Sequence, residues 1–338
     1  MPNTIPFATA ASIAHELRPW RSLELTGKSP VACRLQELVR RTSQLESGVL
    51  LIADPGADAE SIARELHARG RAAASLFVTV DCGASDAAGL EHIIFGVPSA
   101  SGASDLEPVS AASSAAAARG GTLFLQDVVD LPAALQARLS RMARDREVLV
   151  EGEILPTDFR LIASAPASID RDVRENRFRA DLYRRLTASR IDMPPLRSRL
   201  EDVPDLACRL LEDLAGAAGT AAHSFAPASL ALLSAVHWPG NLAELRGVVG
   251  DLVRTTPCEV IQLEHVLPAL QLQRSAPSLI PSGTLRDARL KFERDYISAV
   301  LQHHGWRMAE AAQALGIQRP NLYRKARQLG IPLNRTSE

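Results

Sequence analysis

The chain has 338 residues, 46% of them hydrophobic, and a formal net charge of −1, a composition typical of a globular protein of two or three domains. No apolar run approaches the roughly 18 residues of a membrane span, and the stretch MPNTIPFATAASIAHELRPW lacks the basic start of a secretory signal. Four scattered cysteines without a C-x-x-C pair favour neither a disulfide framework nor a zinc site. We therefore expect a cytoplasmic protein with no metal centre and no membrane partner.

Strands alternate with helices through the first half of the chain. The apolar pattern predicts strands over 49–52, 76–82, 122–128 and 159–165. It also predicts a helix that follows the first of these strands and ends at about Gly70, and a second helix over 132–144. Short apolar runs separated by helices are typical of a parallel sheet that is covered on both faces. The expected fold class is therefore α/β in this part of the chain.

Composition divides the rest of the chain. The Ser/Ala-rich stretch between Gly96 and Gly121 is of low complexity, and we expect it to be mobile. From about Pro204 the pattern is helical, and QRSAPSLIPSG (273–283) reads as a linker. The last 55 residues, Thr284 to Glu338, carry ten Lys and Arg against five Asp and Glu. A basic tail on an acidic body suggests that the tail binds nucleic acid.

The turn after the first strand has the frame of a phosphate loop. Laid on the pattern G-x-x-x-x-G-K-[ST], the slots hold Ala53, Asp58, Ala59 and Glu60. The lysine is missing, and Asp58 adds a negative charge where an anion would bind. Asp58 is also well placed to cap the helix that follows, worth about 1 kcal/mol. Either this is a phosphate loop that has lost its function, or the strand–turn–helix is a coincidence.

The stretch GWRMAEAAQALGIQRPNLYRKARQLGI (305–331) is the most specific signal in the sequence. It predicts a short helix from Ala309 to Leu315, a turn at Gly316, and a second helix that buries an apolar stripe. This is a helix-turn-helix whose second helix would lie in the major groove of double-stranded DNA. The candidate DNA-binding residues are Arg307, Arg319, Asn321, Tyr323, Arg324, Lys325, Arg327 and Gln328.

The preceding helix, about 284–303, has two apolar stripes. One stripe can hold the helix-turn-helix while the other meets a second copy of the chain, so we expect a dimer that reads two half-sites.

Five stretches give the chain a resemblance to a known family. The C-terminal part resembles the Fis-type (factor for inversion stimulation) DNA-binding domain, and residues 27–270 resemble the AAA+ domain of bacterial enhancer-binding proteins, the activators of sigma-54 RNA polymerase. The matching motifs, in order, are GGTLFLQDV (120–128), FRADLYRRL (178–186), MPPLRSRLEDVPDLA (193–207) and HWPGNLAELRGVV (237–249). No receiver domain precedes them, so the resemblance implies a short, two-module member.

The resemblance also implies a nucleotide site, from which this sequence departs. The family's loop reads GESGTGKE against ADPGADAE (53–60), its Asp-Glu pair is Gln126 and Asp127 here, and Ala243 takes the place of a phosphate-sensing arginine. The polar pair expected after the next strand is Ala165 and Pro166. These losses predict a domain that is not an ATPase and needs no cofactor. The remnants of the site are Asp54, Gly56, Asp58, Ala59, Gln126, Asp127, Arg179, Arg185 and Ala243.

Two further features follow from the same resemblance. Arg179 and Arg185 match the family's arginine fingers, which reach a neighbour's nucleotide in a ring; we expect them here to pair with carboxylates such as Asp181 or Glu201. The family's sigma-contacting GAFTGA loop is replaced by VPSASGASDLEP after Gly96. Remodelling of a sigma-54 promoter complex is therefore not expected, although RNA polymerase stays among the candidate partners.

A cyclic dinucleotide is an alternative ligand. Some family members bind cyclic di-GMP through an arginine in an aromatic-Arg-Ser-Leu segment and an arginine on the helix after the phosphate loop. Trp20 and Arg21 match the first position and Arg64 the second. In the alternative interpretation, Trp20 packs on the sheet and Arg64 makes a surface ion pair.

These observations predict a DNA-binding regulator, nucleoid-associated, whose AAA+ domain serves oligomerisation or ligand sensing. The alternatives are an ATP- and Mg²⁺-dependent sigma-54 activator, a regulator that responds to cyclic di-GMP, and a chain that poisons rings of an intact paralogue. The expected division is a lead-in segment (1–26), a degenerate AAA+ α/β subdomain (27–195), a helical lid (196–270), a linker (271–283) and a Fis-type helix-turn-helix domain (284–338).

Overall fold

The computed structural model describes residues 22–97, 106–218, 224–256, 258–275, 297, 301, 308–314 and 319–328. The chain divides into two compact units, Met1–Gln273 and Arg274–Glu338. Trp20, Arg21, Arg307 and most of the helix expected over 284–303 lie outside the described residues.

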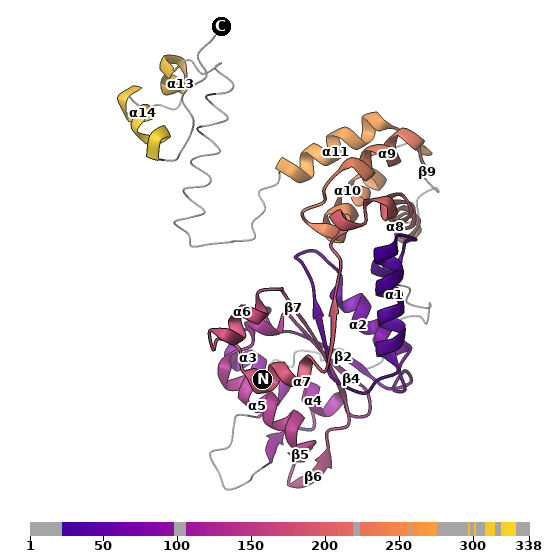
Figure 1. Cartoon of the computed structure of the whole chain (residues 1–338), viewed down its shortest axis with the longest axis vertical. Coiled ribbons are helices and arrows are strands. Elements are labelled where there is room, and N and C mark those ends of the chain that lie inside the picture. The colour runs from indigo at the N-terminus through magenta and orange to yellow at the C-terminus, as the bar shows by residue number, and fades with distance from the viewer. Residues whose placement is uncertain are drawn as a thin grey trace, which may run out of the picture. The chain divides into compact units, whose positions relative to one another are not determined.

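The first unit is built on a parallel sheet of five strands in the order β2-β4-β7-β1-β8 (Figure 1). Its strands are β1 (Val49–Ile52), β2 (Phe77–Asp81), β4 (Thr122–Gln126), β7 (Arg160–Ala165) and β8 (Ser189–Asp192). The predicted α/β class is thus confirmed, and the four predicted strands lie within two residues of their expected bounds.

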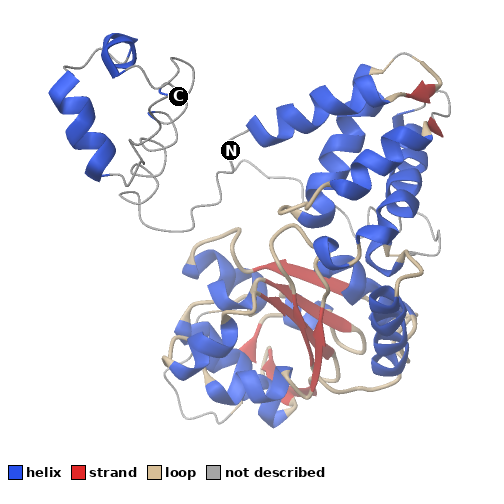
Figure 2. Cartoon of the chain, turned by 45° about the horizontal axis from the view of Figure 1, so that its top comes forward, coloured by secondary structure: helices blue, strands red, loops and turns tan. Residues whose placement is uncertain are grey.

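Helices cover both faces of this sheet (Figure 2). Because successive side chains of a strand point to opposite faces, Val49 and Leu51 pack in one apolar core while Leu50 and Ile52 pack in the other. The surrounding helices are α1 (Pro30–Ser43), α2 (Ala59–Ala68), α3 (Ala87–Ile94), α5 (Ala133–Asp145), α6 (Ile169–Arg174) and α7 (Ala180–Leu186).

The Ser/Ala-rich stretch contains ordered structure, so the expectation that all of it is mobile was wrong. Its second half forms strand β3 (Glu107–Val109) and helix α4 (Ser114–Ala117), and β3 begins a small sheet with the hairpin β5 (Glu147–Val150) and β6 (Glu153–Pro156). The buried guanidinium of Arg138 holds this region. It forms an ion pair with Glu107 and donates to the carbonyl of Val97 at 2.9 Å. Alanine and serine composition conceals such long-range contacts.

A helical subdomain follows the sheet. Its helices are α8 (Val203–Ala218), α9 (Pro227–Ala235), α10 (Asn241–Thr255) and α11 (Leu263–Ser275), and the short strands β9 (Ser224–Phe225) and β10 (Val260–Ile261) pair beside them. Trp238 is fully buried in its apolar core and donates its indole N–H to the carbonyl of Leu233 at 3.0 Å. Within the described residues, no helix is long and apolar enough to cross a membrane.

The second unit contains the two predicted helices, α13 (Met308–Ala314) and α14 (Arg319–Gln328). Leu322 and Ala326 of α14 are fully buried against Ala311 of α13, as the apolar stripe predicts. The third residue of that stripe, Leu329, lies outside the described residues.

Candidate functional site

Asp58, the last residue of the loop between β1 and α2, caps the start of α2. The carboxylate of Asp58 accepts the backbone N–H of Ser61 at 3.1 Å, and the hydroxyl of Ser61 donates to the carbonyl of Asp58 at 2.8 Å. The predicted cap is therefore present. It places a carboxylate at the end of the helix where the backbone N–H groups would otherwise attract an anion.

Two neighbouring N–H groups of the loop also have acceptors within the protein. Ala57 donates to the carbonyl of Asp54 at 3.1 Å, and Ala59 donates to that of Ala57 at 3.2 Å. Pro55 has no N–H to donate. The side chain of Ala59, in the lysine slot, is buried in the core on that face of the sheet. Part of the backbone that cradles phosphate in a working loop is thus hydrogen-bonded within the protein.

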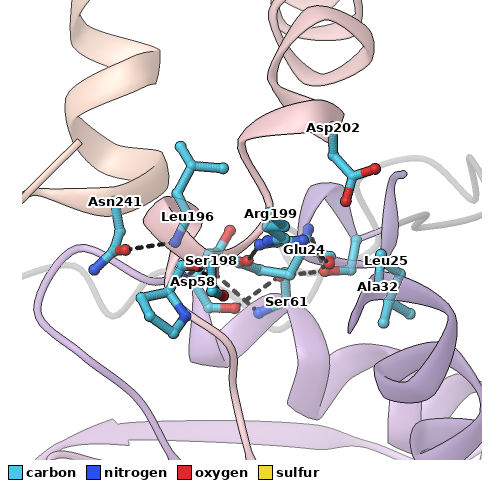
Figure 3. A network of polar contacts seen from close by, with 12 residues as sticks. Glu24, Leu25, Ala32, Asp58, Ser61, Leu196, Ser198, Arg199, Asp202 and Asn241 are labelled. Atoms are coloured by element: carbon cyan, nitrogen blue, oxygen red, sulfur yellow. Dashed lines mark hydrogen bonds and ion pairs between the residues drawn. The ribbon is translucent and has the colours of Figure 1, made fainter. Parts of the chain in front are cut away.

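A second carboxylate reaches the loop from the segment before α1 (Figure 3). Glu24, in the short 3₁₀ helix Leu23–Leu25, accepts the backbone N–H of Asp58 at 2.9 Å. Its other oxygen pairs with the buried guanidinium of Arg199, which also donates to the Glu24 carbonyl at 2.6 Å. Burial raises the pKa of the Glu24 carboxyl, while Arg199 and the Asp58 N–H act in the opposite direction.

The helical subdomain contacts the loop directly. The Asn241 amide donates to the carbonyl of Pro55 at 2.8 Å and accepts the N–H of Leu196 at 2.9 Å. One residue further on, Gly56 has a φ of +81° and its carbonyl accepts the N–H of Ala243 at 2.9 Å. Any side chain at Gly56 would overlap the backbone of Gly240, the residue before α10, so only glycine fits there.

Asp54 is also bound to the helical subdomain. Its carboxylate forms an ion pair with Arg197 at 2.8 Å. The sequence-based interpretation missed Glu24, Arg197, Arg199 and Asn241, which complete the site. The cap at Asp58 is the part of this arrangement that the sequence predicted.

Gln126 and Asp127, which match the positions of the Asp-Glu pair in the resemblance, lie at the end of β4. Asp127 has a left-handed backbone with φ 50°, and its N–H donates to the hydroxyl of Ser164 at 2.9 Å. Desolvation and the nearby carboxylates of Asp130 and Asp81 raise the pKa of the Asp127 carboxyl. Across the described residues, no three His, Cys, Asp or Glu side chains are grouped so that they could hold a metal ion.

The two arginines that resemble arginine fingers have different partners. Arg179 makes a two-pronged ion pair with Asp181, at 2.8 and 3.0 Å, as expected, and this pair lowers the pKa of the Asp181 carboxyl. Arg185 pairs with neither Asp181 nor Glu201 in the described structure, so that expectation was wrong for this residue. It donates to the carbonyl of Ala143 at 3.2 Å, because the end of α5 lies within its reach.

The residues that suggested cyclic di-GMP are only partly described. Arg64 forms an ion pair with Glu60 at 2.6 Å and lies over the ring of Phe77 at 4.6 Å. These contacts match the interpretation of Arg64 as a surface ion pair. Trp20 and Arg21 lie outside the described residues.

Most candidate DNA-binding residues lie on α14. Arg319 and Tyr323 are exposed, with the guanidinium 5.9 Å from the ring centre, and Lys325 is partly exposed. The backbone also places Asn321, Arg324, Arg327 and Gln328 on this helix. Seven of the eight predicted residues thus lie on the second helix of the helix-turn-helix.

Comparison with known proteins agrees with this architecture. Residues 25–192 match the model of the sigma-54 interaction domain, residues 197–279 the AAA+ ATPase lid domain, and residues 289–329 the bacterial regulatory protein, Fis family.

Full-length relatives extend the match. The transcriptional regulatory protein ZraR of Escherichia coli (strain K12) is 34% identical over 305 residues, which cover 89% of this chain and 68% of ZraR. The regulator AlgB of Pseudomonas putida is 32% identical over 91% of this chain and 67% of its own length. Among solved structures, NtrX from Brucella abortus in complex with ADP has a TM-score of 0.64 and 29% identity, covering 92% of this chain and 70% of NtrX. The chain therefore belongs to the family of sigma-54-dependent transcriptional regulators, with a sigma-54 interaction domain, an AAA+ lid domain and a Fis-type helix-turn-helix that indicates DNA binding.

Proposed function

We propose that this chain is a sequence-specific DNA-binding regulator whose AAA+ domain does not hydrolyse ATP and serves oligomerisation or ligand sensing. It acts either as a repressor or as an activator with the housekeeping sigma factor. The observation that carries this proposal is the internal bonding of the phosphate loop. Ala57, Asp58 and Ala59 all donate their backbone N–H groups to acceptors within the protein.

Charge supports the same conclusion. A working loop offers a lysine and free N–H groups to the β- and γ-phosphates. Here the carboxylates of Asp58 and Glu24 each accept a backbone N–H at the start of α2, and Ala59 supplies no cation. An incoming triphosphate would meet two carboxylates where it needs donors, and displacing that of Glu24 would leave the buried guanidinium of Arg199 without its carboxylate.

The catalytic groups are missing independently of the loop. Gln126 cannot hold Mg²⁺ as a carboxylate does, and Asp127 is one carbon shorter than the glutamate that polarises water in the family. Ala243 contributes only its backbone to the loop contact. Each such electrostatic group typically contributes roughly 10²-fold to the rate, so their combined loss supports the absence of turnover.

The alternative function is ATP-dependent activation of sigma-54 polymerase. In its favour, the similar NtrX from Brucella abortus has been solved in complex with ADP and with ATP, so an AAA+ core of this kind holds nucleotide in that protein. Against it stand the substitutions in the loop of this chain. The sequence VPSASGASDLEP after Gly96, in place of the family's GAFTGA loop, also stands against it, although residues 98–105 lie outside the described residues.

The test has two arms. Capture and sequencing of the genomic DNA bound in the cell identifies the operators, and binding of the full chain to one of them is then compared with and without MgATP. We expect the same affinity in both conditions, since no step of operator binding needs nucleotide. Operator binding that requires MgATP, or that MgATP strengthens tenfold, would contradict the proposal.

A further inference from the structure

A cavity of about 790 Å³ lies at the amino ends of the strands of the sheet, whereas the phosphate loop lies at their carboxyl ends. Its lining includes the residues immediately before four strands, namely Gly48, Gly121, Phe159 and Ala188. The phosphate loop follows the carboxyl end of β1, so the length of the strand separates the two sites. A volume of this size is typical of pockets for small organic ligands.

The charged groups that line this cavity are mainly cationic. Two acids, Glu46 and Asp158, stand against four arginines from separate parts of the chain, which are Arg71, Arg146, Arg160 and Arg185. The cavity also contains His67, whose pKa is lowered by burial, so this ring adds no charge at neutral pH. The lining thus carries a net charge of about +2, which favours an anion.

Two of the four arginines have structural roles. Arg71 forms an ion pair with Glu46 at 2.9 Å. Arg160 donates to the carbonyls of Thr42, at 2.7 Å, and Ser43, at 3.4 Å, which belong to the last turn of α1. A guanidinium at the end of a helix stabilises its unpaired carbonyls, so Arg160 is explained without a ligand.

The other two arginines keep unused hydrogen-bonding capacity. Within the described residues, the side chain of Arg146 is exposed and makes no hydrogen bond or ion pair. The Nε of Arg185 is buried without a hydrogen-bond partner, although its Nη1 donates to the carbonyl of Ala143. A buried N–H without an acceptor is unfavourable, and a small movement toward a bound anion would satisfy it.

The backbone at Arg146 adds an independent observation. Arg146 ends α5 with φ 56°, the left-handed conformation that glycine adopts most easily at this position. A residue other than glycine is unfavourable in this conformation, and among the residues that the structure describes the side chain of Arg146 makes no hydrogen bond that would cap α5. Strain of this kind is found at ligand sites more often than elsewhere.

Apolar side chains complete the lining. Leu45 is 51% exposed, and Phe159 and Leu161 also line the cavity. We propose that this cavity binds a small organic phosphate, whose anionic group lies between the guanidinium groups of Arg146 and Arg185 and whose body covers Leu45. Guanidinium groups bind phosphate oxygens in a two-pronged geometry, which suits the open sides of these two arginines. The site is independent of the phosphate loop and of ATP.

Arginine-selective labelling with phenylglyoxal tests this proposal on the unmodified full chain, with pyrophosphate as the probe. We expect saturating pyrophosphate to slow the labelling of Arg146 at least about fivefold, as an occupied site requires. Arg144 is the internal control, because it is exposed two residues away, pairs with Asp145 and does not line the cavity. Its labelling should not change. Equal protection of both arginines, or none, would overturn the proposal.

Two further readouts separate this site from the phosphate loop. Arg197 lies beside that loop, so protection of Arg197 without Arg146 would place pyrophosphate there and refute the cavity site. In thermal unfolding, pyrophosphate should raise the Tm of the wild type and of Arg144→Gly but not of Arg146→Gly. Because glycine suits the backbone of residue 146, a loss of the shift in Arg146→Gly cannot be attributed to misfolding. An unchanged shift in that variant would contradict the proposal.

Discussion

The side-chain amide of Asn241 donates a hydrogen bond to the backbone carbonyl of Pro55 at 2.8 Å, across 186 positions of sequence. The same amide accepts the N–H of Leu196 at the start of the helical subdomain (Figure 3). One buried side chain therefore joins the altered phosphate loop, the backbone at Leu196 and the first turn of α10. These hydrogen bonds join the α/β and helical subdomains at the loop.

Replacement of Asn241 by alanine should destabilise the first unit by about 2 kcal/mol, since the buried N–H of Leu196 loses its acceptor, at about 1–3 kcal/mol, and the more exposed carbonyl of Pro55 loses a donor. Asn176 is a matched control. It has a similar left-handed backbone, φ 56° against 49°, and is exposed. Chemical denaturation of Asn241→Ala and Asn176→Ala compares them at equal backbone strain. Equal losses in the two variants would show that the Asn241 contacts contribute nothing.

The cap at Asp58 predicts that three substitutions at this position change the free energy of unfolding by different amounts. Asp58→Ala should lower the free energy of unfolding by about 1 kcal/mol, whereas Asp58→Gly should cost only a few tenths, because glycine is tolerated at this position. Asp58→Asn retains the acceptor for Ser61 and should be nearly neutral. Urea denaturation measures all three. A stabilised Asp58→Ala would mean that the charge beside Glu24 outweighs the cap.

The pairing of Arg179 with Asp181 predicts a pH dependence. The ion pair lowers the pKa of Asp181 below the ordinary value of about 3.9 for the unfolded chain. The pair therefore stabilises the fold above that pH, and this contribution is lost as the pH falls through the lowered pKa. An NMR titration of the Asp181 carboxyl should show the low pKa, and Arg179→Gln should return it toward 3.9. An ordinary pKa in the wild type would indicate that Arg179 is free to reach a neighbouring chain.

Two substitutions on α14 distinguish contacts with DNA phosphates from contacts with bases. Lys325→Ala should weaken binding to all sequences and reduce the slope of log affinity against log salt by about 1. Asn321→Ala should relax specificity at one base position, by about 1–3 kcal/mol, with little change in that slope. Fluorescence anisotropy with the full chain over a range of salt measures both. A chain that binds no DNA even at low salt would contradict the assignment of α14.

Local pattern was enough to predict the strands of the sheet and the helix-turn-helix. The runs at Val49–Ile52 and Thr122–Gln126 are apolar and short, and Leu322 and Ala326 have helical spacing. The site was predictable only where a residue acts on its own neighbours, as Asp58 does. Glu24 lies 34 positions from the N–H that it accepts, so no local pattern reveals its role.

Contacts between distant residues also explain the errors. A Ser/Ala-rich composition suggested mobility, but the ion pair between Glu107 and the buried Arg138 fixes β3. Arg185 was expected to find a carboxylate because guanidinium groups usually do. It lies instead against the carbonyl end of α5, a position that only the packing of α7 on α5 determines.

ATP hydrolysis by the purified full chain is the most direct test of the central claim, that the AAA+ core has no working phosphate loop. With saturating ATP and Mg²⁺, we expect no phosphate release above that of the Asp127→Ala variant, since the loop has no lysine and the N–H groups of Ala57, Asp58 and Ala59 already have acceptors within the protein. Magnesium-dependent turnover at about one per second, within the ordinary range for enzymes, that disappears in Asp127→Ala would contradict it.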